Sequence, residues 1–265
     1  MQRFWIAAGL LLSLVNGLSA APVNNPSAPA LIKDGFFISP TSWLDFRLGY
    51  EGNFVNDAKM KQTQESFGRV DDFKIDVNAG SCTLNFWNRL DLYGIFGAAR
   101  IRGLWQCSPA DALRQVDTET KYRFTWAAGG KVMLFEWGRT ALTVGGRYFF
   151  TRPKLEWLTW NGSPYAVGTA KYRFREWQAD LGLSHQIDLL TPYLGIKYSR
   201  KNAHLRQVTS VAIATDGSGS IHMRERQKIG MVAGCGLSSR KFFMLNLEVR
   251  LIDEEALTVT GDFRF

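Results

Sequence analysis

The carboxy-terminal stretch constrains the fold more than any other feature of the sequence. Residues 256–265 alternate between apolar and polar side chains and end on an aromatic residue. A period of two indicates a β-strand with one apolar and one polar face. About ten residues is also the length with which a tilted strand crosses a bilayer. We therefore interpret this stretch as the last strand of a closed membrane β-barrel.

The amino-terminal residues predict export. Arg3 precedes the largely apolar run 4–15, and small residues follow around Ala20. This arrangement is typical of a secretory signal peptide, which we assign to residues 1–20. Residues 21–40, rich in Pro, Asn and Ser, are interpreted as an N-terminal extension on the periplasmic side. No other window approaches the roughly 18 apolar residues of a transmembrane helix, so a membrane location would require a barrel.

Alternating stretches recur throughout residues 41–265. Short connections tend to alternate with longer polar ones, as in bacterial outer-membrane barrels. The predicted strands lie in residues 43–54, 73–79, 90–96, 122–134, 142–148, 177–183, 194–198, 229–233, 243–251 and 256–265. The predicted fold class is therefore all-β, a single transmembrane antiparallel up-and-down barrel of about ten strands, with eight or twelve as alternatives.

The formal charge of +8 does not point to nucleic acid, because no Lys- and Arg-rich block occurs and the charge is spread over the strands. A soluble secreted β-sandwich is compatible with the composition. It would not explain an apolar face on every strand up to the last residue.

The three cysteines, Cys82, Cys107 and Cys235, all lie in the exported part of the chain. An odd number in an oxidising compartment leaves at least one thiol free or paired with another chain. All three are therefore candidates for an intermolecular disulfide. No CxxC motif occurs, and no metal site is predicted.

Catalysis is not predicted either. Ser184 and His185 are adjacent, and Asp188 follows closely. Neighbouring residues of a strand point to opposite faces, so this nucleophile and base cannot pair directly. We expect no enzymatic activity and no cofactor.

Basic side chains on polar strand faces are the candidate pore lining. Four of them occupy alternate positions of residues 222–228 and share one face. Turned inward, they would form a cationic ladder that attracts anions; the alternative is a solvated strand end above the membrane. The pore-lining candidates are Arg123, Lys131, Arg147, His222, Arg224, Arg226 and Lys228. The acidic residues expected to face inward, where they could neutralise this charge, are Asp45, Glu51, Asp76, Asp91, Asp180, Glu248 and Asp262.

Several segments form a set of motifs: the run NFWNRLDLYGIFGA at 85–98, the pair EWQADLGLS at 176–184 and TPYLGIKYSR at 191–200, RLIDE at 250–254, and the terminal FRF at 263–265. Together they resemble the chlamydial major outer membrane protein, a porin family. This chain is shorter than well-known members. It has Trp137-Gly138-Arg139 where the family has a Cys-Gly-Cys turn, so the resemblance does not carry over the family's cross-linking role.

The resemblance implies an outer-membrane porin for passive diffusion of ions and small solutes. It also implies a homotrimer among outer-membrane lipids, and an aromatic assembly signal at Phe263 and Phe265 that is read by the barrel assembly machinery. Eight strands leave an interior just filled by side chains, whereas 16–18 leave a channel. A barrel of about ten strands lies between these cases. A closed structural or adhesive surface barrel is therefore the alternative function.

Overall fold

The computed structural model describes residues 22–32, 35, 42–63, 69–107, 114–207, 220–238 and 241–265. The signal peptide assigned to residues 1–20 lies outside the described residues. No helix in the described part of the chain is long and apolar enough to cross a membrane.

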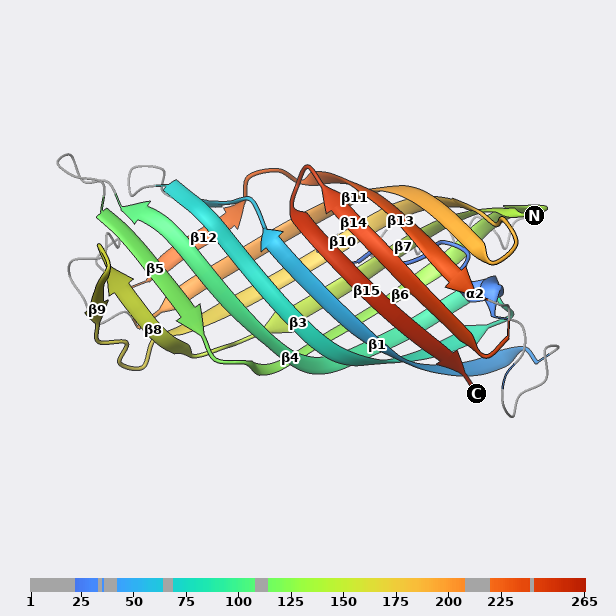
Figure 1. The fold of residues 1–265 in the computed structure, drawn as a ribbon, viewed down its shortest axis with the longest axis horizontal. Helices are drawn as coiled ribbons and strands as arrows, with labels where there is room; N and C mark the ends of the chain where they lie inside the picture. Colours follow the sequence, from blue (N-terminus) through green and yellow to red (C-terminus); the bar gives the residue numbers. More distant parts are fainter. Residues whose placement is uncertain are drawn as a thin grey trace, which may run out of the picture.

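Among the described residues, ten long antiparallel strands form one closed ring (Figure 1). In chain order they are β1 (Leu44–Asp57), β3 (Arg69–Phe86), β4 (Leu90–Cys107), β6 (Arg123–Trp137), β7 (Thr140–Thr151), β10 (Lys171–His185), β11 (Leu190–Arg206), β13 (Ile229–Ser238), β14 (Phe243–Leu251) and β15 (Glu255–Arg264). Each pairs with the strands before and after it in this order. The up-and-down barrel of ten strands predicted from the sequence is confirmed.

The carboxy-terminal strand closes the ring. β15 pairs with β14 on one side and with β1 on the other, with Leu48 opposite Phe263 and Phe54 opposite Leu257. Because the first and last strands pair, the ring has no open sheet edge, which is the condition for placing a sheet in lipid.

Short strands in the long connections extend the wall at one end of the barrel. They are β2 (Met60–Gln62), β5 (Arg114–Thr120), β8 (Leu155–Trp160), β9 (Ser163–Tyr165) and β12 (Ile221–Glu225). At the opposite end lie tight turns at 87–89, 138–139 and 186–189, the helix α2 (Ala28–Leu31) and the carboxy terminus (Figure 1). Outer-membrane barrels have short periplasmic turns and longer extracellular connections. We therefore orient this second end to the periplasm.

In the periplasmic part of the barrel the polar face of each strand is buried and the apolar face is exposed. On β14, Leu247 is 50% exposed, whereas its neighbours Glu248 and Arg250 are 1% and 0% exposed. A protein in water would show the reverse. The exposed apolar band is the surface that faces lipid.

In the extracellular part the two faces exchange character. Along β10, Leu181 and Leu183 point outward next to buried Asp180, but further up Tyr172 and Phe174 point inward and are fully buried. The same exchange occurs on β3, where Phe73 and Ile75 are buried and Asp76 lies on the outer side. The prediction that Asp76 faces inward is therefore wrong.

The strand lengths explain the exchange. β3 and β4 each contain 18 residues, whereas a bilayer crossing needs about 9–11. The remaining length stands in water and buries its apolar face against the opposite wall. Phe73 stacks on Phe174 with ring centroids 5.9 Å apart, and Tyr172 donates to or accepts from Thr118 at 2.9 Å. An apolar core thus fills the extracellular half of the barrel.

Candidate functional site: the barrel interior

The amino-terminal segment, residues 22–32, lies inside the barrel at the periplasmic end. Asn25 is fully buried, and Ile32 is 2% exposed. The Lys131 ammonium donates to the backbone oxygens of Val23, Asn24 and Asn25, the last two at 2.8 and 3.3 Å. Residues 21–40 were predicted to be an N-terminal extension on the periplasmic side. Residues 22–32 of that stretch do lie at the periplasmic end, but inside the barrel.

Inward side chains from several strands hold this segment. The backbone N–H groups of Val23 and Asn24 donate to the Glu248 carboxylate at 3.0 and 2.8 Å. Arg47 donates to the Ala28 carbonyl at 2.9 Å, and Asn85 donates to the Pro29 carbonyl at 3.1 Å. A segment inside a barrel that pairs with no strand leaves backbone groups without partners, and these side chains supply them. We call residues 22–32 the inner segment.

Two glycines make room for the inner segment. A Cβ atom on Gly182 of β10 would lie 2.6 Å from Pro26 Cγ, and one on Gly236 of β13 would lie 2.2 Å from Asn25 Nδ2. Both distances are shorter than any normal contact. The wall and the inner segment are therefore fitted to each other.

An ion pair crosses the lumen next to the inner segment. The two terminal nitrogens of Arg147 on β7 donate to both carboxylate oxygens of Glu51 on β1 at 2.8 and 2.7 Å. The two strands stand four places apart in the ring. Both side chains are at most 2% exposed. A bidentate pair of this kind ties distant parts of the wall together.

A second buried network lies on the β11–β14 side. Lys197 and Lys201 of β11 pair with Asp253 and Glu254, which fold inward from the β14–β15 turn; Lys197 lies 3.0 Å from Asp253, and Lys201 lies 2.7 Å from Glu254. Arg250 joins the same carboxylate of Glu254 at 2.5 Å. Lys197, Lys201 and Arg250 are not among the lining residues predicted from the sequence. Their alternation with the outward residues Ile196, Tyr198 and Val249 is the sequence signal by which they could have been identified.

Two of the seven predicted lining residues lie inside the described barrel and bond within it, Lys131 and Arg147. Arg123 begins β6 and is exposed. His222 and Arg224 lie on the outer side of β12, because Ile221 and Met223 are the buried set. Arg226 and Lys228 are exposed in the connection to β13.

The expectation of an inward cationic ladder at 222–228 is therefore corrected. His222 and Arg224 do share one face of β12, as their alternate positions predicted. However, β12 belongs to the extracellular part, where the polar face of each strand points outward. The anion preference expected from that ladder has no basis inside the lumen.

The three cysteines and the Ser184–His185 pair are the remaining candidates from the sequence. Cys82 and Cys235 are free and half-buried on the outward faces of β3 and β13, and the side chain of Cys107 lies outside the described residues. An intermolecular disulfide stays a prediction. Ser184 bonds Ser27 inside the barrel at 2.6 Å, whereas His185 bonds Thr140 at an exposed position at 2.8 Å. The two face opposite sides, as parity predicted.

The interior holds little free space along the inner segment. A cavity of about 40 Å³ lies between the inner segment and the wall, lined in part by Arg47, Glu51 and Tyr93. A second, of about 170 Å³, lies at the periplasmic end beside Leu31 and Met133. Above them the apolar core closes the tube. The described structure is a barrel with two successive barriers: the inner segment with its ion pairs, and the apolar core.

Comparisons with known proteins agree with the sequence motifs. The family described as Chlamydia major outer membrane protein matches residues 161–220. The chain is 26% identical to the major outer membrane porin, serovar F, of Chlamydia trachomatis, over 96% of this chain and 97% of the relative. It is 25% identical to the serovar E porin with the same coverage.

Two solved barrels show a weak structural likeness. The outer membrane protease OmpT from Escherichia coli is 11% identical with a TM-score of 0.45, covering 84% of this chain and 96% of that one. The outer membrane protein OprG from Pseudomonas aeruginosa is 7% identical with a TM-score of 0.39, covering 83% and 96%.

The match at 161–220 includes the β10–β11 pair, where the motifs at 176–184 and 191–200 lie. The similarity to the porins covers nearly the whole of both chains, and the fold is a closed barrel with an apolar outer band. The resemblance stated from the motifs is confirmed, and this outer-membrane β-barrel is similar to the major outer membrane porins of Chlamydia trachomatis over nearly its whole length.

Proposed function

We propose that this protein is an outer-membrane porin whose permeation path is the barrel interior, and that the described structure is its closed form. The observation that carries the proposal is the polar inner wall of the membrane-embedded part, on a chain related to porins along nearly its full length. Transport through such a path is passive diffusion of ions and small solutes, with no catalytic group and no energy source.

Opening requires two rearrangements. The inner segment must leave the periplasmic half, where hydrogen bonds from Lys131, Arg47 and Asn85 hold it. The apolar core around Phe73 and Phe174 must also admit water. Apolar constrictions gate channels by excluding water, so a modest widening there is sufficient to switch conduction.

The packing of the extracellular half favours a second candidate, a closed structural or adhesive surface barrel without significant conductance. Phe73, Phe174 and Phe149 come from three different strands, and their rings meet at about 6 Å. A core of this kind is what a permanently closed barrel would contain.

Single-channel recording separates the two functions. The processed chain would be refolded in detergent, inserted in planar bilayers, and compared with a variant lacking residues 22–32 and with Phe73→Ser/Phe174→Ser. Because the barriers lie in series, each change alone is expected to give brief openings, and the two together a steadily open channel. Gly182→Val is the matched point variant, since it displaces Pro26 without shortening the chain.

Folding is monitored by heat-modifiable migration in detergent gels. A folded combined variant that passes no ions would contradict the porin and establish the closed barrel. Steady conduction in the unmodified chain, unchanged by deletion of residues 22–32, would show that the inner segment does not block the path. The proposal of a porin would still hold.

We further propose, from the family resemblance alone, a homotrimer and recognition of the terminal strand by the outer-membrane assembly machinery. The trimer would bury part of the exposed apolar band. Cross-linking of the protein in native membranes tests this assembly.

A further inference from the structure

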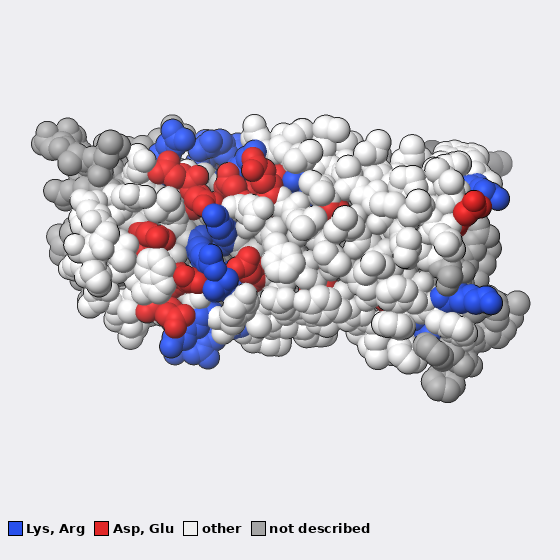
Figure 2. Space-filling view, viewed as in Figure 1, with Lys and Arg blue, Asp and Glu red and all other residues white. Residues whose placement is uncertain are grey.

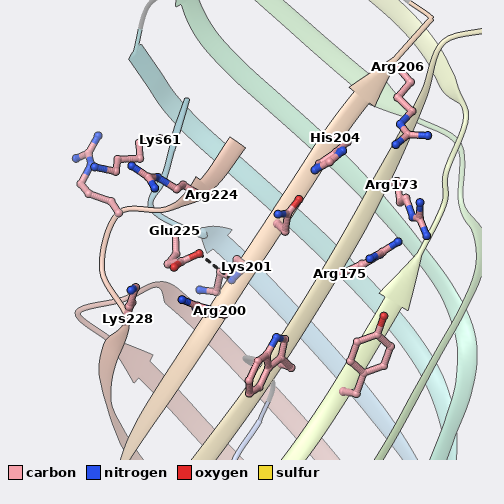
Figure 3. Close-up of a pocket in the computed structure, with 14 residues that line it drawn as sticks. Lys61, Arg173, Arg175, Arg200, Lys201, His204, Arg206, Arg224, Glu225 and Lys228 are labelled. Carbon is pink, nitrogen blue, oxygen red and sulfur yellow. Dashed lines mark hydrogen bonds between the residues drawn. The ribbon is translucent and has the colours of Figure 1, made fainter. Parts of the chain in front are cut away.

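A basic groove lies on the outer surface of the barrel wall, above the apolar band. It has a volume of about 760 Å³ and runs over β10, β11, β12 and the connection to β13 (Figure 3). Arg173, Arg175 and Arg200 line it from the outer strand faces, while the alternate residues Phe174 and Ala203 point inward and are fully buried. The groove is therefore lined mainly from the outer face of the wall, although the buried residues Lys201 and Glu225 also border it.

The strand register brings basic residues together on the outer face. Arg224 is directly opposite Lys61, and Arg175 is separated from Arg224 by the neutral Asn202. Like charges directly opposite each other on one sheet face are destabilising. An anion bound in the groove would offset this repulsion.

Within the described ranges, no ion pair joins an acidic residue to Arg173, Arg175, Arg200 or Arg224. The acidic residue that lines the groove, Glu225, is only 8% exposed, and its carboxylate accepts the backbone N–H of Lys201 at 3.1 Å. Figure 3 shows these basic side chains from different elements around the same hollow.

The same level of the barrel is neutralised on another side. On the β3–β5 sector, Arg100 lies 2.8 Å from both Asp76 and Glu119, and Lys74 lies 2.9 Å from Asp72. Figure 2 shows this mixed belt of acidic and basic residues. Acidic side chains therefore neutralise the basic residues of the β3–β5 sector, whereas the groove keeps a net positive charge.

The groove lies at the depth of the lipid head groups. On β11 the outward residues are apolar from Leu190 to Tyr198, and Arg200 follows. From Leu190 to Tyr198 the strand advances eight residues at about 3.3 Å each, and a tilt of about 40° turns this length into a height of about 20 Å along the barrel axis. This height is close to the roughly 25 Å apolar band of such barrels. Tyr198 and Trp177 at the boundary are residues that favour the interface.

We propose that this groove binds the phosphate groups of an outer-leaflet lipid head group. Guanidinium groups bind phosphate in bidentate geometry, and several arginines around one hollow match a doubly phosphorylated sugar head group. The acyl chains then lie along the exposed apolar faces of Leu194 and Ile196 directly below. The lipid phosphates supply counter-ions to Arg175, Arg200 and Arg224. The inference holds whether or not the barrel conducts.

Native mass spectrometry of the full processed chain in detergent, titrated with diphosphoryl lipid A, tests the proposal. We expect one tightly bound lipid, with at least about tenfold weaker binding of the dephosphorylated form. Arg175→Ser/Arg200→Ser is expected to weaken binding by about tenfold or more. The matched control is Arg100→Ser/Arg102→Ser, two outward arginines at the same level that have acidic partners, and its affinity is expected to stay within about twofold.

Competitors separate the sources of phosphate. Inorganic phosphate is expected to displace the lipid only at a large molar excess, because it lacks the acyl chains. Equal affinity for inorganic phosphate would overturn the assignment to a lipid. Tight binding of heparin without binding of lipid A would assign the groove to a sulfated polysaccharide instead. Unchanged lipid binding in a folded Arg175→Ser/Arg200→Ser variant would overturn the site itself.

Discussion

Single residues inside the barrel act mainly through buried ion pairs. Arg147 and Glu51 are shielded from solvent and bond through both oxygens. Replacing Glu51 by Gln leaves a buried guanidinium without its counter-ion, so we expect the free energy of unfolding to fall by about 3–5 kcal/mol. Glu51→Leu/Arg147→Met removes both charges and is expected to restore most of the loss. Urea unfolding in lipid vesicles measures both.

The control for this pair is Arg139→Gln. Arg139 pairs with Asp188 at 3.8 Å, but their side chains are 61% and 87% exposed. Such a surface pair contributes about 0–1 kcal/mol. If Glu51→Gln were no more costly than Arg139→Gln, the pair across the lumen would carry no stability.

Sequence reasoning identified part of this interior and missed another part for a physical reason. Lys131 and Arg147 lie on strands whose outward apolar rows are unbroken, so parity identified the inner face. Lys197 and Arg250 occupy the same kind of position, and the alternation of their strands indicates that they face inward. Their carboxylate partner Glu254 comes from the β14–β15 turn, and a strand pattern does not show that a turn folds inward.

At the scale of elements, the terminal strand closes the structure. The backbone N–H of Phe265 donates to the Phe46 carbonyl at 2.9 Å, and the rings of Phe263 and Phe243 lie 4.9 Å apart. Deleting residues 263–265 is expected to lower the yield of folded barrel about tenfold or more, because an unclosed edge in lipid leaves backbone groups unpaired. Heat-modifiable migration measures this yield.

Export of the truncated chain is expected to be normal, as judged by its recovery in the periplasmic fraction. Tyr165→Ala, in the exposed hairpin strand β9, is the control and is expected to fold as the unmodified chain does. Full assembly of the truncated chain would show that closure and recognition do not depend on these residues.

The ten membrane strands were all predictable because period-two alternation survives along each of them. Four of the five short strands were not, since three to seven residues carry too few periods to distinguish a strand from a loop. The fifth, β12, falls within the alternating stretch at 222–228. The inner segment was not predictable either. Its Pro, Asn and Ser content indicates irregular structure, but irregular chain inside a barrel and outside it have the same composition.

At the scale of the whole molecule, the barrel consists of two parts with opposite polarity. The periplasmic part is apolar outside and ion-paired inside, and the extracellular part is charged outside and apolar inside. The ten strands run through both parts without interruption. Alternation alone therefore locates the strands. Whether the apolar or the polar residues point outward shows whether lipid or water surrounds each part.

An arginine scan along the outer face of β11 tests the boundary between these two parts. Leu194 lies in the middle of the apolar band and is 64% exposed, and Asn202 lies two outward positions beyond Tyr198. Leu194→Arg is expected to cost about 2–4 kcal/mol in vesicles, because the charge enters the bilayer near its middle. Asn202→Arg is expected to cost only about 1 kcal/mol or less, because the new charge stays in water although it lies opposite Arg175 and Arg224. Urea titration followed by tryptophan fluorescence gives both values, and equal costs at the two positions would place the membrane boundary elsewhere on the strand.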